Sequence, residues 1–130
     1  MLMGSQCMYF ANKEIPSNIA LLGVVNEKDK NRIFSVVDFA LNPMMSGSGT
    51  NLKMFDYMSA GIPIISTEFG MRGIEERDCF VRVENNELSK AVKEFSLMEY
   101  ESMIKKARKH VVDTFDWDVI VENLMKVIGE

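Results

Sequence analysis

Four small residues between a predicted strand and a predicted helix are the positions of this chain best suited to binding a phosphate group. They are Gly47, Ser48, Gly49 and Thr50. Glycines at such a junction let backbone N–H groups approach an anion closely, and the helix N-terminus adds partial positive charge. A Gly-x-Gly sequence alone is not specific, because a tight turn with Ser48 or Thr50 as the helix cap has the same sequence. Both interpretations remain open at this level.

Asp56 extends the candidate site along the helix that follows. It lies seven residues after Gly49, which is about two helical turns or ~10 Å along the axis. Its neighbours are largely apolar, which predicts a helix packed on most of its circumference, where a carboxylate needs a partner or a ligand. The sugar hydroxyl groups of a nucleotide whose phosphates lie at the helix N-terminus would be such a ligand. An aspartate on the protein surface is the equal alternative.

These residues must be positioned by alternating strands and helices. An apolar stub is expected at 1–3, strands at 18–25, 37–42, 62–66 and 79–83, and helices at 27–36 and 50–60, followed by helical apolar periods across 88–95, 100–111 and 117–128, the last with Asp116 as its N-cap. This alternation predicts an α/β fold with a parallel sheet that helices cover on both faces. Ligands bind outside the carboxyl ends of the strands in such sheets, which is where the glycine loop lies.

Length and composition narrow the function classes. The chain has 130 residues, a formal net charge of −4, 47% hydrophobic and 26% charged residues. This predicts one globular domain over residues 1–130 and excludes a disordered chain. Net negative charge with scattered basic residues predicts no nucleic-acid partner. The length also leaves no room for a two-domain enzyme with its site in an interdomain cleft.

The cysteines and the apolar runs bear on compartment and metal binding. Cys7 and Cys79 are far apart and belong to no Cys-x-x-Cys pair, so they are expected to be buried free thiols. With His110 they make too few ligands for a zinc site. No signal peptide is expected, and the longest apolar run, 19–25, is far shorter than the ~20 residues that span a bilayer. We therefore expect a cytoplasmic protein without a metal.

The segment from Pro43 to Ile65 carries a family resemblance. Asp56–Ile65 reads Asp-Tyr-Met-Ser-Ala-Gly-Ile-Pro-Ile-Ile, which resembles the helix Glu-Ala-Met-Ala-x-Gly-x-Pro and the following Val-Ile strand of the GT-B glycosyltransferases of group 1, or GT4. Gly49 matches the second glycine of their Glu-Gly-Phe-Gly loop. Segments 18–23, 37–43 and 115–117 resemble other parts of the C-terminal domain in the same order, so the resemblance covers nearly the whole chain.

The resemblance implies a Rossmann-like domain, the C-terminal half of a GT-B fold, with half of a site for a nucleotide-sugar donor. The implied donor-binding residues are Gly47, Ser48, Gly49, Thr50, Lys53 and Asp56. Backbone amides of the loop would meet the diphosphate, and Asp56 would replace the glutamate that binds the ribose hydroxyls. Ser48 stands where the family has a glutamate that contacts the sugar. Lys53 is either a phosphate ligand or a solvated lysine. No catalytic residue is assigned, and no cofactor is expected besides the donor as substrate.

The resemblance also implies that part of the family domain is missing. The family domain starts one strand and one helix earlier, with the central strand of a 3-2-1-4-5-6 sheet and with the Arg and Lys that neutralise the diphosphate. Residues 1–4 resemble the end of its second strand. The N-terminal domain, which carries the acceptor site, is absent as well. We therefore expect no transfer by this chain alone, and a sheet that closes locally or is completed by another chain, for example in a homo-oligomer.

Two functions remain open from the sequence. The first is the donor-binding domain of a retaining glycosyltransferase with an unknown acceptor. The second is a non-catalytic nucleotide-binding or scaffold domain derived from that family, which Ser48 in place of glutamate favours. A basic cluster at Lys105, Lys106, Arg108 and Lys109 is interpreted as a solvated helix face, with a peripheral membrane contact as the alternative. A receiver-like signalling domain is disfavoured because its acidic pair is missing.

Overall fold

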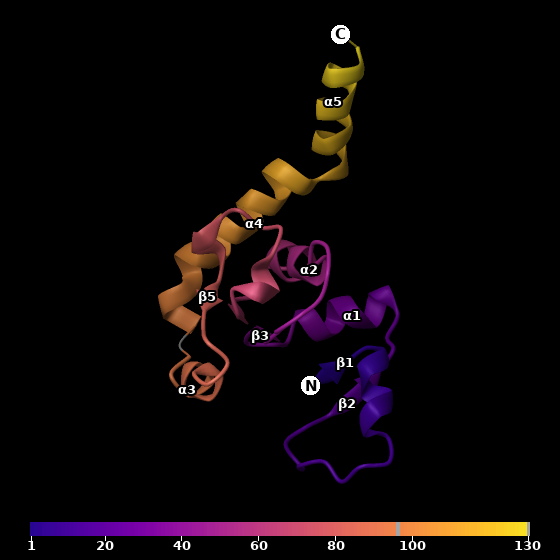
Figure 1. Cartoon of the computed structure of the whole chain (residues 1–130), viewed down its shortest axis with the longest axis vertical. Coiled ribbons are helices and arrows are strands. Elements are labelled where there is room, and N and C mark those ends of the chain that lie inside the picture. Colours follow the sequence, from indigo (N-terminus) through magenta and orange to yellow (C-terminus); the bar gives the residue numbers. More distant parts are fainter. Residues whose placement is uncertain (96, 130) are drawn as a thin grey trace. The chain divides into compact units, whose positions relative to one another are not determined.

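The computed structural model describes residues 1–95 and 97–129 and has parallel strands flanked by helices (Figure 1). This α/β, Rossmann-like arrangement confirms the expected fold class. The chain forms two compact units, Met1–Val36 and Val37–Glu130.

The first unit contains a two-stranded parallel sheet. Strand β1 (Leu2–Met3) pairs with β2 (Leu21–Gly23), with an irregularity in register between its two residues. The expected strand at 18–25 is shorter because the N–H of Ile19 bonds the carbonyl of Pro16 in a turn, and because Gly23 has a φ of 66°. A 3-10 helix, η1 (Ser5–Phe10), follows β1, and α1 (Glu27–Phe34) follows β2. Asn26 caps α1 by accepting a hydrogen bond from the N–H of Asp29 at 2.9 Å.

The second unit contains a three-stranded parallel sheet in the order β3-β4-β5. Its strands are β3 (Ala40–Asn42), β4 (Ile64–Ser66) and β5 (Val81–Arg82). Asn42 lies opposite Ser66, and Ser66 lies opposite Arg82, so the carboxyl ends of the strands are aligned. The expected strands at 37–42, 62–66 and 79–83 all begin too early. Ile62 bonds the carbonyl of Tyr57 in the turn that ends a helix, and Cys79 belongs to a 3-10 turn.

Four α-helices and three 3-10 helices complete the described part of this unit. They are α2 (Lys53–Ser59), η2 (Phe69–Met71), η3 (Arg77–Cys79), α3 (Leu88–Lys93), η4 (Leu97–Tyr100), α4 (Glu101–Phe115) and α5 (Trp117–Ile128). Asp116 alone separates α4 from α5 (Figure 1). Its side chain accepts a hydrogen bond from the N–H of Asp118 at 3.0 Å, which confirms the expected cap.

Helix α2 begins three residues later than the sequence predicts. The N-cap position is Leu52, and no side chain caps the helix. The interpretation with Ser48 or Thr50 as a cap is therefore wrong. The expected contribution of a helix N-terminus to the glycine loop is wrong too, since Gly49 has a φ of 71° and α2 starts only at Lys53.

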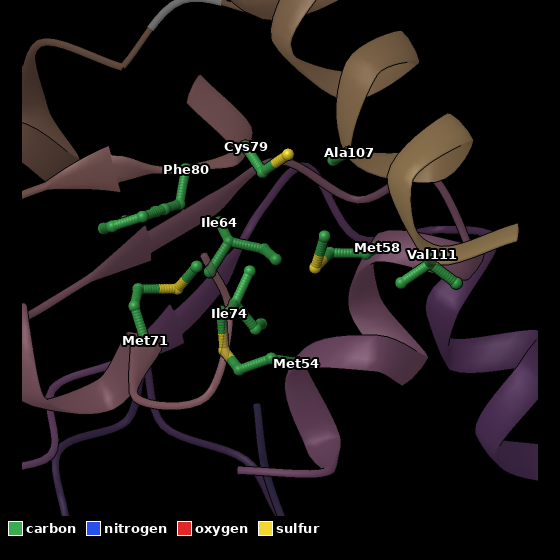
Figure 2. Packing of buried hydrophobic residues seen from close by; sticks show 9 residues of the cluster. All are labelled: Met54, Met58, Ile64, Met71, Ile74, Cys79, Phe80, Ala107 and Val111. Atoms are coloured by element: carbon green, nitrogen blue, oxygen red, sulfur yellow. The ribbon is translucent and has the colours of Figure 1, made fainter. Parts of the chain in front are cut away.

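A hydrophobic core packs α2 and α4 against the three-stranded sheet (Figure 2). Its buried residues are Met54, Met58, Ile64, Met71, Ile74, Cys79, Phe80, Ala107 and Val111. Each large apolar side chain buried here contributes about 1.5–3 kcal/mol relative to its exposed state. Three methionines thus fill the core, as their frequency suggested. The rings of Phe55 and Phe115 extend the contact at a centroid distance of 4.4 Å.

Both cysteines are buried free thiols, as expected. Burial, together with the nearby carboxylates of Glu76 and Asp78, raises the pKa of Cys79 to about 11. A thiol in this state is a small apolar side chain and not a nucleophile.

Helix α5 buries none of its side chains fully, and most of its apolar residues face solvent. Its apolar residues are exposed, from 37% for Ile120 to 76% for Trp117 and Val127. The exposed set is Trp117, Ile120, Val121, Leu124, Met125, Val127 and Ile128. The periodic pattern that predicted this helix is therefore present without a described packing partner.

Candidate functional site

The candidate site is built from two segments that follow neighbouring parallel strands. Residues 43–52 come after β3, and residues 67–74 come after β4. Because the carboxyl ends of β3 and β4 are aligned, the two segments leave the sheet side by side. This edge of an open α/β sheet is where ligands bind.

A buried polar cluster ties the two segments together at their base. Asn42 is fully buried, and its Nδ2 donates to the carbonyl of Gly70 at 2.9 Å and to the Oγ of Ser66 at 3.3 Å. The hydroxyl of Ser66 donates to the carbonyl of Asn42 at 3.1 Å. Among the described residues the Oδ1 of Asn42 has no hydrogen-bond partner. The N–H groups of the Asn42 side chain thus hold it in place. This fixes the backbone at the point where β3 ends and the loop begins.

Further contacts pin both ends of the glycine loop to the segment after β4. The Nδ2 of Asn51 donates to the carbonyl of Gly70 at 3.1 Å, and the Oγ1 of Thr67 donates to the carbonyl of Met44 at 2.5 Å. Gly73 packs directly on Thr50, because a Cβ at Gly73 would lie 2.5 Å from the Oγ1 of Thr50. The loop is therefore anchored before and after its two glycines.

Arg72 contacts the glycines themselves. Its Nε donates to the carbonyl of Gly49 at 2.7 Å, and its Nη1 donates to the carbonyl of Gly47 at 3.2 Å. The guanidinium also lies over the ring of Phe69, 4.5 Å from the centroid. Gly47 and Gly49 have φ values of 144° and 71°, which other residues rarely adopt. One arginine therefore bridges two positions of the loop whose backbone conformation favours glycine.

The structure brings only some of the predicted site residues into this cluster. Gly47, Gly49 and Thr50 contact the segment after β4, whereas Ser48 is exposed at the tip of the loop. Lys53 and Asp56 lie further along on α2, and both are exposed. The expectation that α2 is packed on most of its circumference is wrong, because the helix fully buries only Met54 and Met58.

Two side chains of α2 have shifted pKa values. Partial desolvation lowers the pKa of Lys53, although much of the side chain remains exposed. Burial raises the pKa of Tyr57, and the carboxylate of Asp56 raises it further. The negative charge of Asp56 therefore disfavours ionisation of the Tyr57 hydroxyl.

An open hollow of about 690 Å³ lies beside Arg72. Glu68, Phe69, Arg72, Glu75 and Arg77 line it together with Met71, Gly73 and Ile74. Glu68 forms ion pairs with Arg77 and with Arg82, and the hydrogen bond from Arg77 lowers its pKa. The lining includes none of the six residues predicted from the sequence, so the loop after β4 adds a surface that the prediction lacked.

Sequence reasoning missed Arg72 and the segment around it. The sequence did contain an indication: Gly70-Met71-Arg72-Gly73 places a basic residue between glycines just after a strand. Its position next to the glycine loop follows from the pairing of β3 with β4.

The basic cluster on α4 is largely paired. Lys106 forms an ion pair with Asp78 at 3.1 Å, Lys105 contacts Glu101 at 3.6 Å, and Lys109 pairs with Asp113. These contacts support the interpretation as a solvated face. His110 in the same helix presents its ring to the edge or face of Phe115 at 5.5 Å.

Residues 1–95 and 97–129 offer neither a cluster of candidate metal ligands nor a helix that could span a membrane. Those residues contain no group of three or more His, Cys, Asp or Glu side chains that could hold a metal ion. Nor do they form a helix with the length and apolar character needed to cross a bilayer.

Comparison with protein families decides the relationship. Residues 3–96, more than half of the chain, match the family model described as glycosyl transferases group 1. The chain belongs to this family. All six predicted residues and Arg72 of this group 1 glycosyltransferase domain fall within the matched range, whereas α4 and α5 lie beyond it. A search of curated protein sequences returned no match.

Proposed function

We propose that this chain binds the nucleotide-sugar donor of a retaining glycosyltransferase, as the C-terminal half of a GT-B enzyme of the GT4 type. One observation carries the proposal. This group 1 glycosyltransferase domain has a glycine loop at the carboxyl edge of its parallel sheet. Arg72 bridges the carbonyls of Gly47 and Gly49 in that loop. Such a loop exposes backbone N–H groups that suit a diphosphate.

The chemistry of this half-site is electrostatic. In a retaining transfer the nucleoside diphosphate leaves the sugar through an oxocarbenium-like transition state, and negative charge grows on the leaving oxygen. Preorganised N–H groups of the loop stabilise that charge. Lys53 and Asp56 are proposed to contact phosphate and ribose, while Ser48 and Thr50 contribute their backbone amides. Ser48 lacks the carboxylate that the family directs at the sugar, so sugar recognition at this position is weaker.

Each of the two sheets has an edge strand with one open side. The described residues form the pair β1-β2 and the triplet β3-β4-β5. Within the described chain, β1 and β3 each pair on one side only. We propose that a strand of another chain, such as a second copy, pairs with the open side of β1 or of β3. Transfer itself requires the N-terminal domain of the GT-B enzyme.

A non-catalytic nucleotide-binding or scaffold role is the second candidate. The exposed Ser48 favours it, because no carboxylate stands at the tip of the glycine loop. A cytoplasmic location fits both candidates, since nucleotide-sugars are made there. The pairing of Lys105, Lys106 and Lys109 with carboxylates leaves little free positive charge for a membrane contact.

Calorimetric titration with UDP- and GDP-sugars tests the donor site. We expect the wild-type chain to bind one of them and Asp56→Ala to weaken that binding about tenfold, the loss typical of one hydrogen bond to a charged group. Asp38→Ala is the matched control, because Asp38 is an exposed aspartate just before the amino end of β3, away from the loop. A wild-type chain that binds neither donor contradicts the proposal, as does equal binding by the Asp56 variant. Transfer by the chain alone would contradict the half-site.

A further inference from the structure

We propose that Arg72 is the positioning residue of the anion site: it turns two peptide groups of the glycine loop so that the N–H groups of Ser48 and Thr50 bind the donor diphosphate. The inference rests on the proposed function and assigns the atoms that would make the contact. It begins from the two hydrogen bonds of the guanidinium, to the carbonyls of Gly49 and Gly47.

The planar trans peptide determines where the N–H groups point. In each peptide unit the C=O and the N–H of the next residue are antiparallel. Because Arg72 holds the carbonyls of Gly47 and Gly49, the N–H groups of Ser48 and Thr50 are directed away from the guanidinium. Neither N–H donates to an acceptor within the described part of the chain. Two free donors on alternate residues of an exposed loop are a suitable cradle for phosphate oxygens.

The charge of Arg72 strengthens these donors. The guanidinium forms no ion pair with any described carboxylate, and Glu68, four residues earlier, pairs with Arg77 and Arg82. Its positive charge therefore acts mainly on the two carbonyls. A hydrogen bond to a carbonyl polarises the peptide group and makes its N–H a better donor. The face of Phe69 covers the guanidinium at 4.5 Å and limits its motion.

The surroundings of Gly47 hold this arrangement in place. A Cβ at Gly47 would lie 3.3 Å from the Cε of Met44 and 3.8 Å from the Nη2 of Arg72. With a φ of 144°, the position also disfavours any side chain. Glycine at this position is therefore required by the backbone conformation and by the tight contact with Met44, whereas the guanidinium would make only an ordinary contact with a Cβ.

The test uses the whole chain labelled with ¹⁵N, with inorganic pyrophosphate, uridine and UDP as probes. Pyrophosphate should shift the amide resonances of Ser48 and Thr50. Arg72→Ala should weaken pyrophosphate and UDP about tenfold while uridine binding is unchanged, and Arg72→Lys should restore part of the loss, because it keeps the charge but cannot bridge both carbonyls. Arg108→Ala is the control, since Arg108 is an exposed arginine on α4. Thermal unfolding confirms that each variant is folded.

The outcomes separate this inference from the proposed function. Pyrophosphate that leaves Ser48 and Thr50 unshifted overturns the role of Arg72, even where Asp56-dependent donor binding upholds the proposed function. An equal loss of uridine and pyrophosphate in Arg72→Ala overturns it too, because that pattern indicates a purely structural role. Arg72-dependent binding of pyrophosphate, with UDP no tighter than pyrophosphate, supports the inference and contradicts the nucleotide-sugar function.

Discussion

Replacing Gly70 by alanine should damage the chain more than its small change in volume suggests. A Cβ at this position would lie 2.4 Å from the Oγ of Ser66, 2.6 Å from the Nδ2 of Asn42 and 2.6 Å from the carbonyl oxygen of Asn42. The last of these atoms belongs to the backbone of β3 and cannot rotate away. Gly70 does not have a positive φ, so the contact itself, and not backbone strain, determines the cost.

The magnitude follows from two effects. Overpacking in a buried site costs about 1–3 kcal/mol. The shift would also break the hydrogen bond from Asn42 to the carbonyl of Gly70, and a buried amide left without its partner costs about 1–3 kcal/mol. Since the two effects overlap, we expect Gly70→Ala to lower the free energy of unfolding by about 2–4 kcal/mol.

Urea unfolding followed by circular dichroism measures this loss. Gly23→Ala is a suitable control, because nothing lies within 4 Å of a Cβ there and only the positive φ of 66° is penalised. That penalty is about 1–2 kcal/mol. A Gly70 variant within about 0.5 kcal/mol of the wild type, which is the range of ordinary surface substitutions, would refute the role assigned to the buried cluster of Asn42 and Ser66.

Two further predictions concern the core. Met58→Ala should lower the free energy of unfolding by about 2–5 kcal/mol, because the side chain is fully buried between α2 and the sheet; a loss below about 1 kcal/mol in urea unfolding would contradict this packing. Cys79 should resist alkylation at pH 8, and stability should fall as pH rises from about 9 towards 11, since the folded pKa of about 11 exceeds the ordinary value of 9.0. Rapid labelling of native Cys79 at pH 8 would contradict its burial.

Local sequence patterns were sufficient to predict the fold class and the glycine-loop half of the candidate site. The strand and helix alternation, the cap at Asp116 and the glycine loop all depend on residues close together in the chain, and the family match at 3–96 confirms the relationship that the motifs suggested. The start of α2 was misplaced because apolar periodicity gives no weight to the positive φ of Gly49, which delays the helix.

The place of Arg72 in the candidate site could not be predicted from the sequence, for a different reason. Its contacts with Gly47 and Gly49 join residues from loops after different strands, and they exist only because β3 pairs with β4. A basic residue between two glycines has many possible environments. The pairing of β3 with β4 determines which of these environments Arg72 occupies.

The bonds that hold the glycine loop also determine when it forms during folding. They join residues 23 to 25 positions apart for Thr67 and Arg72, and 28 positions apart for Asn42 and Gly70. Such non-local contacts are made after chain closure, and they are lost together when the paired segments separate. The loop therefore acquires its shape only with the β3–β4 pair, and a transient opening of residues 67–74 would abolish the proposed diphosphate binding while most helices remained folded.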